Sequence, residues 1–198
     1  MSESFVVLWT LERCRWLQRV RDHGPLEVIF GGPHRSLPTI ESVTIGDAIY
    51  PVCVIDGTIH VIARMHVSSL VPPEEYVAVH FGFTRLPGQM WDVLYQELKR
   101  SGPDFGHRFP TTCCDRAATS VNGSDIRFDR PISAHQMQTL TFGPKPGREK
   151  PLKGLTSGRL RSVFSLQGHV RRLSAPSAAV FEACVGEAPR VETRGNSA

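Results

Sequence analysis

The clearest pattern of hydrophobic and polar positions predicts a β-hairpin between residues 46 and 67. Two stretches rich in β-branched and aromatic residues flank Asp56-Gly57, a dipeptide that accommodates the positive φ angles of a type I′ turn. The second stretch alternates apolar and polar residues, and a period of two places alternate residues on opposite faces of a strand. The sequence therefore predicts a core set of Ile59, Val61, Ala63, Met65 and Val67, and an outward set of His60, Ile62, Arg64 and His66.

The first stretch of this hairpin, residues 48–55, is apolar on both faces. Such a strand is typical of a sheet that is covered on both sides or curled into a barrel. Pro51 interrupts it, because proline has no N–H to donate to a neighbouring strand. We expect Pro51 to lie at a bulge or to point its nitrogen away from a neighbour.

Periodicity, capping residues and turn residues predict the remaining elements. Strands are expected at residues 5–9, 26–30, 124–129 and 159–173, helices at 10–22, from 74, at 87–100, from 133 and at 177–185, and a long loop at 101–123. The helix after residue 10 begins at an N-cap threonine, Thr10, and the helix after residue 133 begins with the Ser133 to Gln136 spacing of a capping box.

The composition is that of an ordinary globular protein, with 198 residues, 40% of them hydrophobic and 21% charged. We expect a single α+β domain over residues 1–185 and a disordered tail over 186–198. Residues 1–4 are polar, and the chain has no apolar run of about 18 residues. These features and five scattered cysteines, which we expect to be reduced, predict a cytoplasmic protein with no membrane span.

Positive charge is concentrated in one segment. Residues 143–175 hold eight Lys or Arg residues and one acidic residue, a net charge of +7, whereas the rest of the chain sums to −3. Such a segment has the charge pattern of a site for phosphates or another polyanion, although a solvated basic loop would have the same pattern. The nucleic-acid-binding residues that we predict are His60, Arg64 and His66 on the hairpin, and Lys150, Lys153, Arg159, Arg161, Arg171 and Arg172 in the basic segment.

Conventional catalytic and metal-binding motifs are absent from the sequence. His107, Cys113, Cys114 and Asp115 could hold zinc or form a thiol–imidazole pair, because thiolate, imidazole and carboxylate groups suit both roles. Adjacent cysteines chelate one metal poorly, however, which favours ordinary loop residues. We therefore predict no catalytic residue, metal or cofactor, and a binding protein in preference to an enzyme.

The segment Ile45-Gly46-Asp47-Ala48-Ile49-Tyr50, followed by the hairpin, resembles the central strand pair of PUA-like domains, and the ASCH and EVE/YTH branches in particular. The resemblance implies a curled mixed β-sheet or small β-barrel with flanking helices. It also implies a non-enzymatic module that binds nucleic acid, RNA or a modified nucleotide. The alternatives are a small thiol- or zinc-dependent enzyme that uses His107, Cys113 and Cys114, and an interaction protein without a ligand of its own. The oligomeric state is not predicted.

Overall fold

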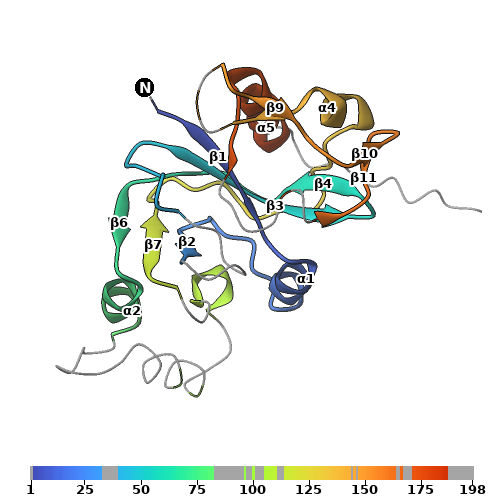
Figure 1. Cartoon of the computed structure of the whole chain (residues 1–198). Helices are drawn as coiled ribbons and strands as arrows, with labels where there is room; N and C mark the ends of the chain where they lie inside the picture. Colours follow the sequence, from blue (N-terminus) through green and yellow to red (C-terminus); the bar gives the residue numbers. More distant parts are fainter. Residues whose placement is uncertain are drawn as a thin grey trace, which may run out of the picture.

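The computed structural model describes residues 2–32, 40–82, 96, 100, 105–110, 114–143, 145, 147–163, 166 and 171–186 (Figure 1). Nearly all of the helix predicted at 87–100 and the tail predicted after residue 186 lie outside these residues.

The largest sheet has five strands and contains the predicted hairpin. Its strands are β1 (Ser4–Leu8), β3 (Ala48–Ile55), β4 (Thr58–Val61), β5 (Met65–His66) and β12 (Arg171–Arg172). The order is β12-β1-β3-β4, with β5 also paired to β3; the β1–β3 pair is parallel and the others are antiparallel. The turn falls at Asp56 and Gly57, both with positive φ, which confirms the hairpin.

A second, antiparallel sheet lies below the first in the view of Figure 1. It has the order β2-β7-β6 and consists of β2 (Val28–Gly31), β7 (Arg116–Thr119) and β6 (Ser69–Val71). Two small hairpins complete the strands: β8 (Thr141–Phe142) with β9 (Lys150–Pro151), and β10 (Leu155–Thr156) with β11 (Arg159–Leu160). The β7 strand lies inside the segment that the sequence predicted as loop.

The mixed α+β architecture is confirmed, whereas a closed barrel is not observed in the described part of the chain. The prediction of a strand at residues 124–129 is wrong. This segment forms separate backbone hydrogen bonds with β4 and the residues after it, without the continuous ladder of a strand. Examples are the bond from Val61 N to the Arg130 carbonyl at 2.9 Å and the bond from Arg127 N to the Ile62 carbonyl at 2.9 Å. The segment therefore runs along the edge of the first sheet without extending it as a regular strand.

The helices are α1 (Leu11–Arg19), α2 (Pro73–Phe81), the 3₁₀ helix η1 (Gly106–Arg108), α4 (Ala134–Thr139) and α5 (Ala175–Gly186). Two of them, α1 and α4, begin where their predicted caps place them, whereas α5 begins two residues before the predicted start at residue 177. The Thr10 side chain accepts a hydrogen bond from Arg13 N at 3.1 Å, and Ser133 and Gln136 form both bonds of the capping box.

Strand β3 contributes to two hydrophobic cores, one on each face of the five-stranded sheet. Ile49 and Cys53 belong to the first core, with α1 and the second sheet. Tyr50 and Val52 belong to the second core, which α4, α5 and the small hairpins cover. A third cluster packs α2 against the outer face of β2 and β7. The prediction that β3 is covered on both sides is confirmed.

A β-bulge lies next to Pro51, but the inserted residue is in the facing chain and Pro51 itself stays in β3. Between the pairs Val52↔Val61 and Ile49↔Met65, β3 has two residues whereas the facing chain has three, residues 62–64. The extra residue reverses the faces of all later side chains on that strand. Ile59 and Val61 consequently pack in the second core, whereas Ala63, Met65 and Val67 pack in the first.

Candidate nucleic-acid interface

The basic segment is anchored by leucines and exposes its cations. Leu152 and Leu160 are buried in the second core, and Leu155 packs against it. The cationic residues beside these anchors are all exposed: Lys145, Arg148, Lys150, Lys153, Arg159 and Arg161. Alternation of apolar anchors and basic residues therefore fixes the backbone of the segment and leaves the charged groups in solvent.

The turn of the predicted hairpin holds this segment in place. The N–H of Leu160 donates to the Gly57 carbonyl at 2.8 Å, and the N–H of Arg161 donates to the Gly154 carbonyl at 2.9 Å. Gly57 has φ +76°, and a Cβ there would lie 2.8 Å from the Leu160 carbonyl oxygen. A glycine is thus required both for the turn and for the close approach of β11.

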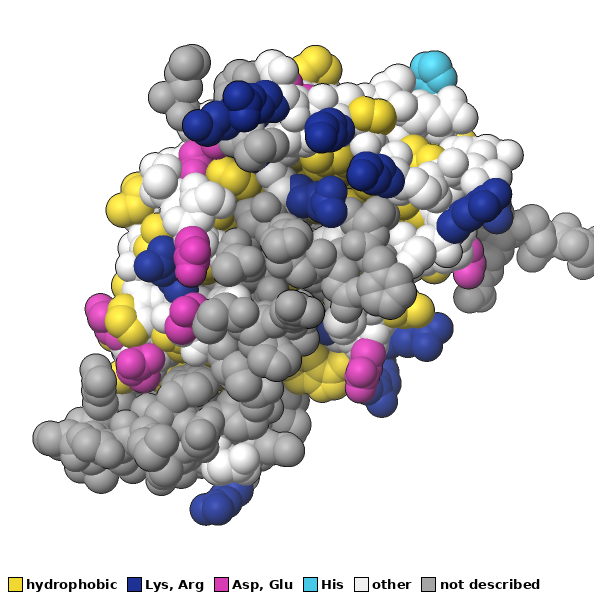
Figure 2. Space-filling view, in the orientation of Figure 1, with side chains coloured by type: hydrophobic (Ala, Val, Ile, Leu, Met, Phe, Trp, Pro, Cys, Tyr) yellow, Lys and Arg dark blue, Asp and Glu magenta, His cyan; other side chains and the backbone are white. Residues whose placement is uncertain are grey.

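The exposed cations have no ion-pair partner among the described residues. Figure 2 shows Lys and Arg side chains in a band across the upper part of the molecule, where Figure 1 places β9, α4, β10 and β11. Acidic side chains lie mostly on the left flank of the same face. This arrangement forms a positive surface available to a polyanion.

The two arginines of β12 differ in their surroundings. Arg172 donates from Nε to the Gly143 carbonyl at 3.1 Å and from Nη2 to Glu149 at 3.3 Å, and its Nη1 lies 3.7 Å from a Glu3 oxygen. Burial lowers the pKa of Arg171, whose Nε has no hydrogen-bond partner within the described residues. Arg172 therefore connects β12 to the start of β1 and to the residue before β9, whereas Arg171 is half-buried and has no carboxylate partner among the described residues.

The residues predicted on the outward face of the hairpin do not share one face, so that part of the prediction is wrong. His60 pairs with Cys53 on the first-core side, and its Nδ1 donates to the Phe128 carbonyl at 2.9 Å. Ile62, which the alternation placed outward, is fully buried in the first core. The bulge is the physical cause, since simple alternation cannot register an inserted residue.

Arg64 and His66 lie on the second-core side, the side that the basic segment also covers. His66 is exposed and pairs with Ala48, whereas Arg64 forms an ion pair with Glu182 of α5. Glu182 also accepts a hydrogen bond from the Tyr50 hydroxyl at 2.8 Å. Burial and, next, this carboxylate raise the pKa of Tyr50.

His107 is committed to a structural clamp. Its Nε2 accepts a hydrogen bond from Glu27 N at 3.0 Å, so its Nδ1 carries the proton that is donated to Asp22 at 2.8 Å. Burial alone would raise the pKa of Asp22, but the hydrogen bonds that it accepts from the ring and backbone of His107 outweigh burial and lower that pKa to about 2. Both ring nitrogens are occupied, which leaves His107 no lone pair for a metal or a thiol.

The alternative thiol or zinc site gains no support from the rest of its residues. Cys114 is buried, and Cys113 lies outside the described residues. Within the part of the chain that the structure describes, no group of three or more His, Cys, Asp or Glu side chains could hold a metal ion. The Asp22–His107 pair itself joins residues 85 positions apart, which no sequence pattern indicated.

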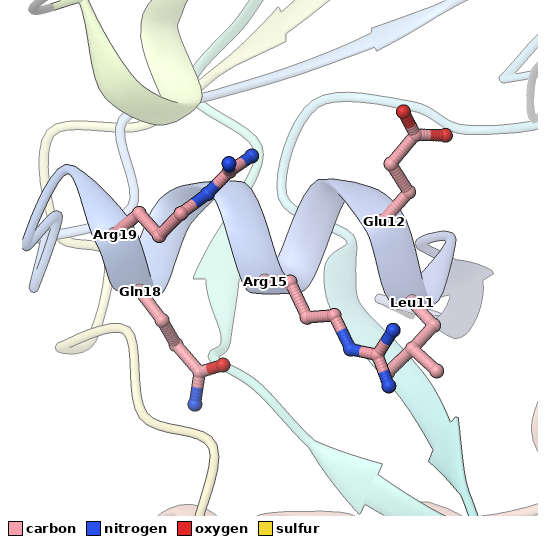
Figure 3. Close-up of a pocket in the computed structure, with 5 residues that line it drawn as sticks. All are labelled: Leu11, Glu12, Arg15, Gln18 and Arg19. Carbon is pink, nitrogen blue, oxygen red and sulfur yellow. The ribbon is translucent and has the colours of Figure 1, made fainter.

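Two of the cavities that described residues line lie beside α1. One, of about 640 Å³, follows the exposed face of α1 (Figure 3). Figure 3 shows Leu11, Arg15 and Gln18 extending to one side of the helix and Glu12 and Arg19 to the other. The second cavity, of about 310 Å³, lies where the C-terminal end of α1 meets η1. The predicted nucleic-acid-binding residues line neither cavity.

Among the described residues, no helix has the length and hydropathy needed to cross a membrane.

No protein-family model matches the chain, and no curated protein matches it. Among solved structures, the chain is similar to a serine-to-alanine variant of ZmASCH from Zymomonas mobilis. The identity is 14% and the TM-score is 0.33, over 83% of this chain and 96% of that chain. ASCH is one of the branches of PUA-like domains that the Ile45–Tyr50 segment resembles. A TM-score of 0.33 with 14% identity supports no conclusion about the function of this chain.

Proposed function

We propose that this protein is a non-enzymatic module that binds single-stranded nucleic acid, RNA in particular, through its basic segment. The observation that carries the proposal is the exposed row of cations on β9–β11, which has no ion-pair partner among the described residues and is anchored by buried leucines. In the proposed complex, the phosphates contact Lys150, Lys153, Arg159 and Arg161, with Arg171 behind them.

The other predicted residues take supporting roles in this proposal. Arg172 positions β12 through its bonds to Gly143 and Glu149, so it affects binding through the fold. Arg64 and His66 border the same side of the sheet, but Arg64 is held by its ion pair with Glu182, so only the exposed His66 is assigned a contact with a base or sugar. His60, on the opposite side, is assigned no contact.

The proposal predicts a strong dependence of affinity on salt, because each neutralised phosphate releases counterions. Four phosphate contacts with a single strand give a slope of about −2.8 in log K against log salt, or a roughly 50-fold loss of affinity between 50 and 200 mM salt. Fluorescence anisotropy with a labelled 20-nucleotide RNA of mixed sequence measures this slope.

Two double variants locate the surface. Lys153→Gln with Arg161→Gln should reduce the slope by about half, because it removes two of the four contacts. Arg15→Gln with Arg19→Gln removes the same charge from exposed positions of α1 and is the matched control, whose slope should not change. Binding that does not respond to salt, or that falls equally in both variants, would contradict the proposal.

A further inference from the structure

The cavity between α1 and η1 has rigid walls. The His107 ring and backbone both bond to Asp22, and the Glu27 N–H donates to the same ring at 3.0 Å. Arg13 adds a bond from Nη2 to the His107 carbonyl at 3.1 Å. A side chain at Gly106 would collide with the Asp22 carboxylate, so the chain passes the clamp in close contact. The backbone of Glu27 and that of the residue after His107 are therefore held in place.

Two of the charged residues that line the cavity, Glu27 and Arg108, are adjacent to this hydrogen-bonded clamp. Their side chains are 37% and 42% exposed, whereas those of Asp22 and His107 are 12% and 4% exposed. The Arg108 Nη1 and Glu27 Oε2 atoms are 3.8 Å apart, which is beyond hydrogen-bond distance. Electrostatic attraction keeps the two side chains adjacent. Because they form no hydrogen bond with each other, the pair uses neither the N–H donors of Arg108 nor the carboxylate oxygens of Glu27.

The cavity suits a small, uncharged, planar ligand. Its volume of about 310 Å³ is at the small end of the range for ligand pockets, roughly 300–1,000 Å³. The formal charges of Arg21 and Arg108 are balanced by those of Asp22 and Glu27 when the histidines are neutral. Phe105, which also lines the cavity, supplies an aromatic ring that is supported by Phe81 at a centroid distance of 4.2 Å. An aromatic ring beside polar groups is the usual setting for an unpaired base.

We propose that this cavity binds a guanine base, with the Glu27 carboxylate accepting hydrogen bonds from its N1–H and N2–H groups and the Arg108 guanidinium donating to O6. Only guanine presents two adjacent donors beside an acceptor on this edge. Adenine and cytosine place a ring-nitrogen lone pair opposite the carboxylate, and uracil offers one N–H. The inference rests on the proposed function insofar as it names the base that the nucleic-acid-binding module selects.

Mononucleotides test the cavity separately from the basic segment. Isothermal titration of the full chain with GMP, AMP, CMP and UMP should show GMP bound at least tenfold more tightly than the others. Glu27→Gln and Arg108→Gln should each weaken GMP binding at least tenfold. Glu12→Gln, which neutralises an exposed carboxylate on α1, should leave it unchanged. Thermal unfolding of the variants checks that the exposed substitutions leave the fold intact.

A pair of oligonucleotides distinguishes guanine in a strand from the free nucleotide. A pentamer with one central G among U residues should bind more tightly than the all-U pentamer, and Glu27→Gln should abolish the difference. If GMP alone is selected and the pentamers bind equally, the guanine inference stands with the free nucleotide as its ligand.

Other outcomes separate the two proposals. Equal binding of all four mononucleotides, or no mononucleotide binding by a protein that binds the 20-nucleotide RNA with the expected salt slope, would overturn the guanine site and leave the proposed function standing. Selective GMP binding without RNA binding would support the cavity and reject the polyanion surface.

Discussion

The Asp22–His107 clamp provides a quantitative test of the structure. In the folded protein the pKa of Asp22 is lowered from its ordinary value of 3.8 to about 2, because the hydrogen bonds from His107 exceed the opposing effect of burial. A carboxyl group with a lowered folded pKa stabilises the fold above its unfolded pKa, and this stabilisation is lost as the pH falls through the folded pKa. The shift corresponds to about 2 kcal/mol at pH 7 and about 1 kcal/mol at pH 3.

The substitution Asp22→Asn removes this pH-dependent contribution, because asparagine does not titrate. Urea unfolding at pH 7 should show a midpoint lower by about 1 M, given a denaturant slope of about 2 kcal/mol per molar. The gap in unfolding free energy between the wild-type protein and the variant should narrow by about half at pH 3.

Glu12→Gln is the control for this experiment, since Glu12 is exposed on α1 and should change the unfolding free energy by less than about 0.5 kcal/mol. A gap between wild-type and Asp22→Asn protein that stays constant from pH 7 to pH 3 would show that Asp22 does not form the described clamp in solution.

Two further predictions concern the hairpin turn and the thiols. Gly57→Ala should lower the melting temperature by several degrees more than Gly46→Ala. Both glycines have positive φ, but only at Gly57 would the added carbon meet the Leu160 carbonyl. Equal losses of melting temperature would be inconsistent with the contact between the turn and β11. Mass spectrometry of native protein treated with iodoacetamide at neutral pH should detect at most one adduct, and unfolded protein should gain five. The four described cysteines are buried, which keeps the reagent away from them. A hydrogen bond with Cys53, together with burial, also raises the pKa of Cys14 and so disfavours its reactive thiolate. Two or more adducts on the native protein would contradict this packing.

The features that could be predicted from the sequence are those set by short stretches of chain. The Asp56-Gly57 turn, the Thr10 cap and the Ser133 capping box each depend on residues within a few positions of one another. β7 was missed because Arg116–Thr119 has little intrinsic β-propensity; it becomes a strand by pairing with β2 and β6 on either side.

The candidate sites divide in the same way. A run of basic residues is visible in the sequence, and the structure places its exposed members beside buried leucines. The separation of His60 from Arg64 and His66 depends on one inserted residue opposite Pro51, which alternation alone does not register. The cavity with Glu27 and Arg108 depends on a contact between Asp22 and His107, and such long-range pairing has no local signature.

The double role of β3 has a consequence for folding. Each face of this strand completes a different core, and its parallel neighbour β1 comes from residues 4–8 while β3 begins at residue 48. The chain must close this connection before either core is complete, because both cores need β3 in place beside β1. Because β3 belongs to both cores, pairing it with β1 completes both in the same step. A substitution that disrupts one core is therefore expected to destabilise the other. The protein is therefore expected to unfold as one cooperative unit, without a stable half-folded state.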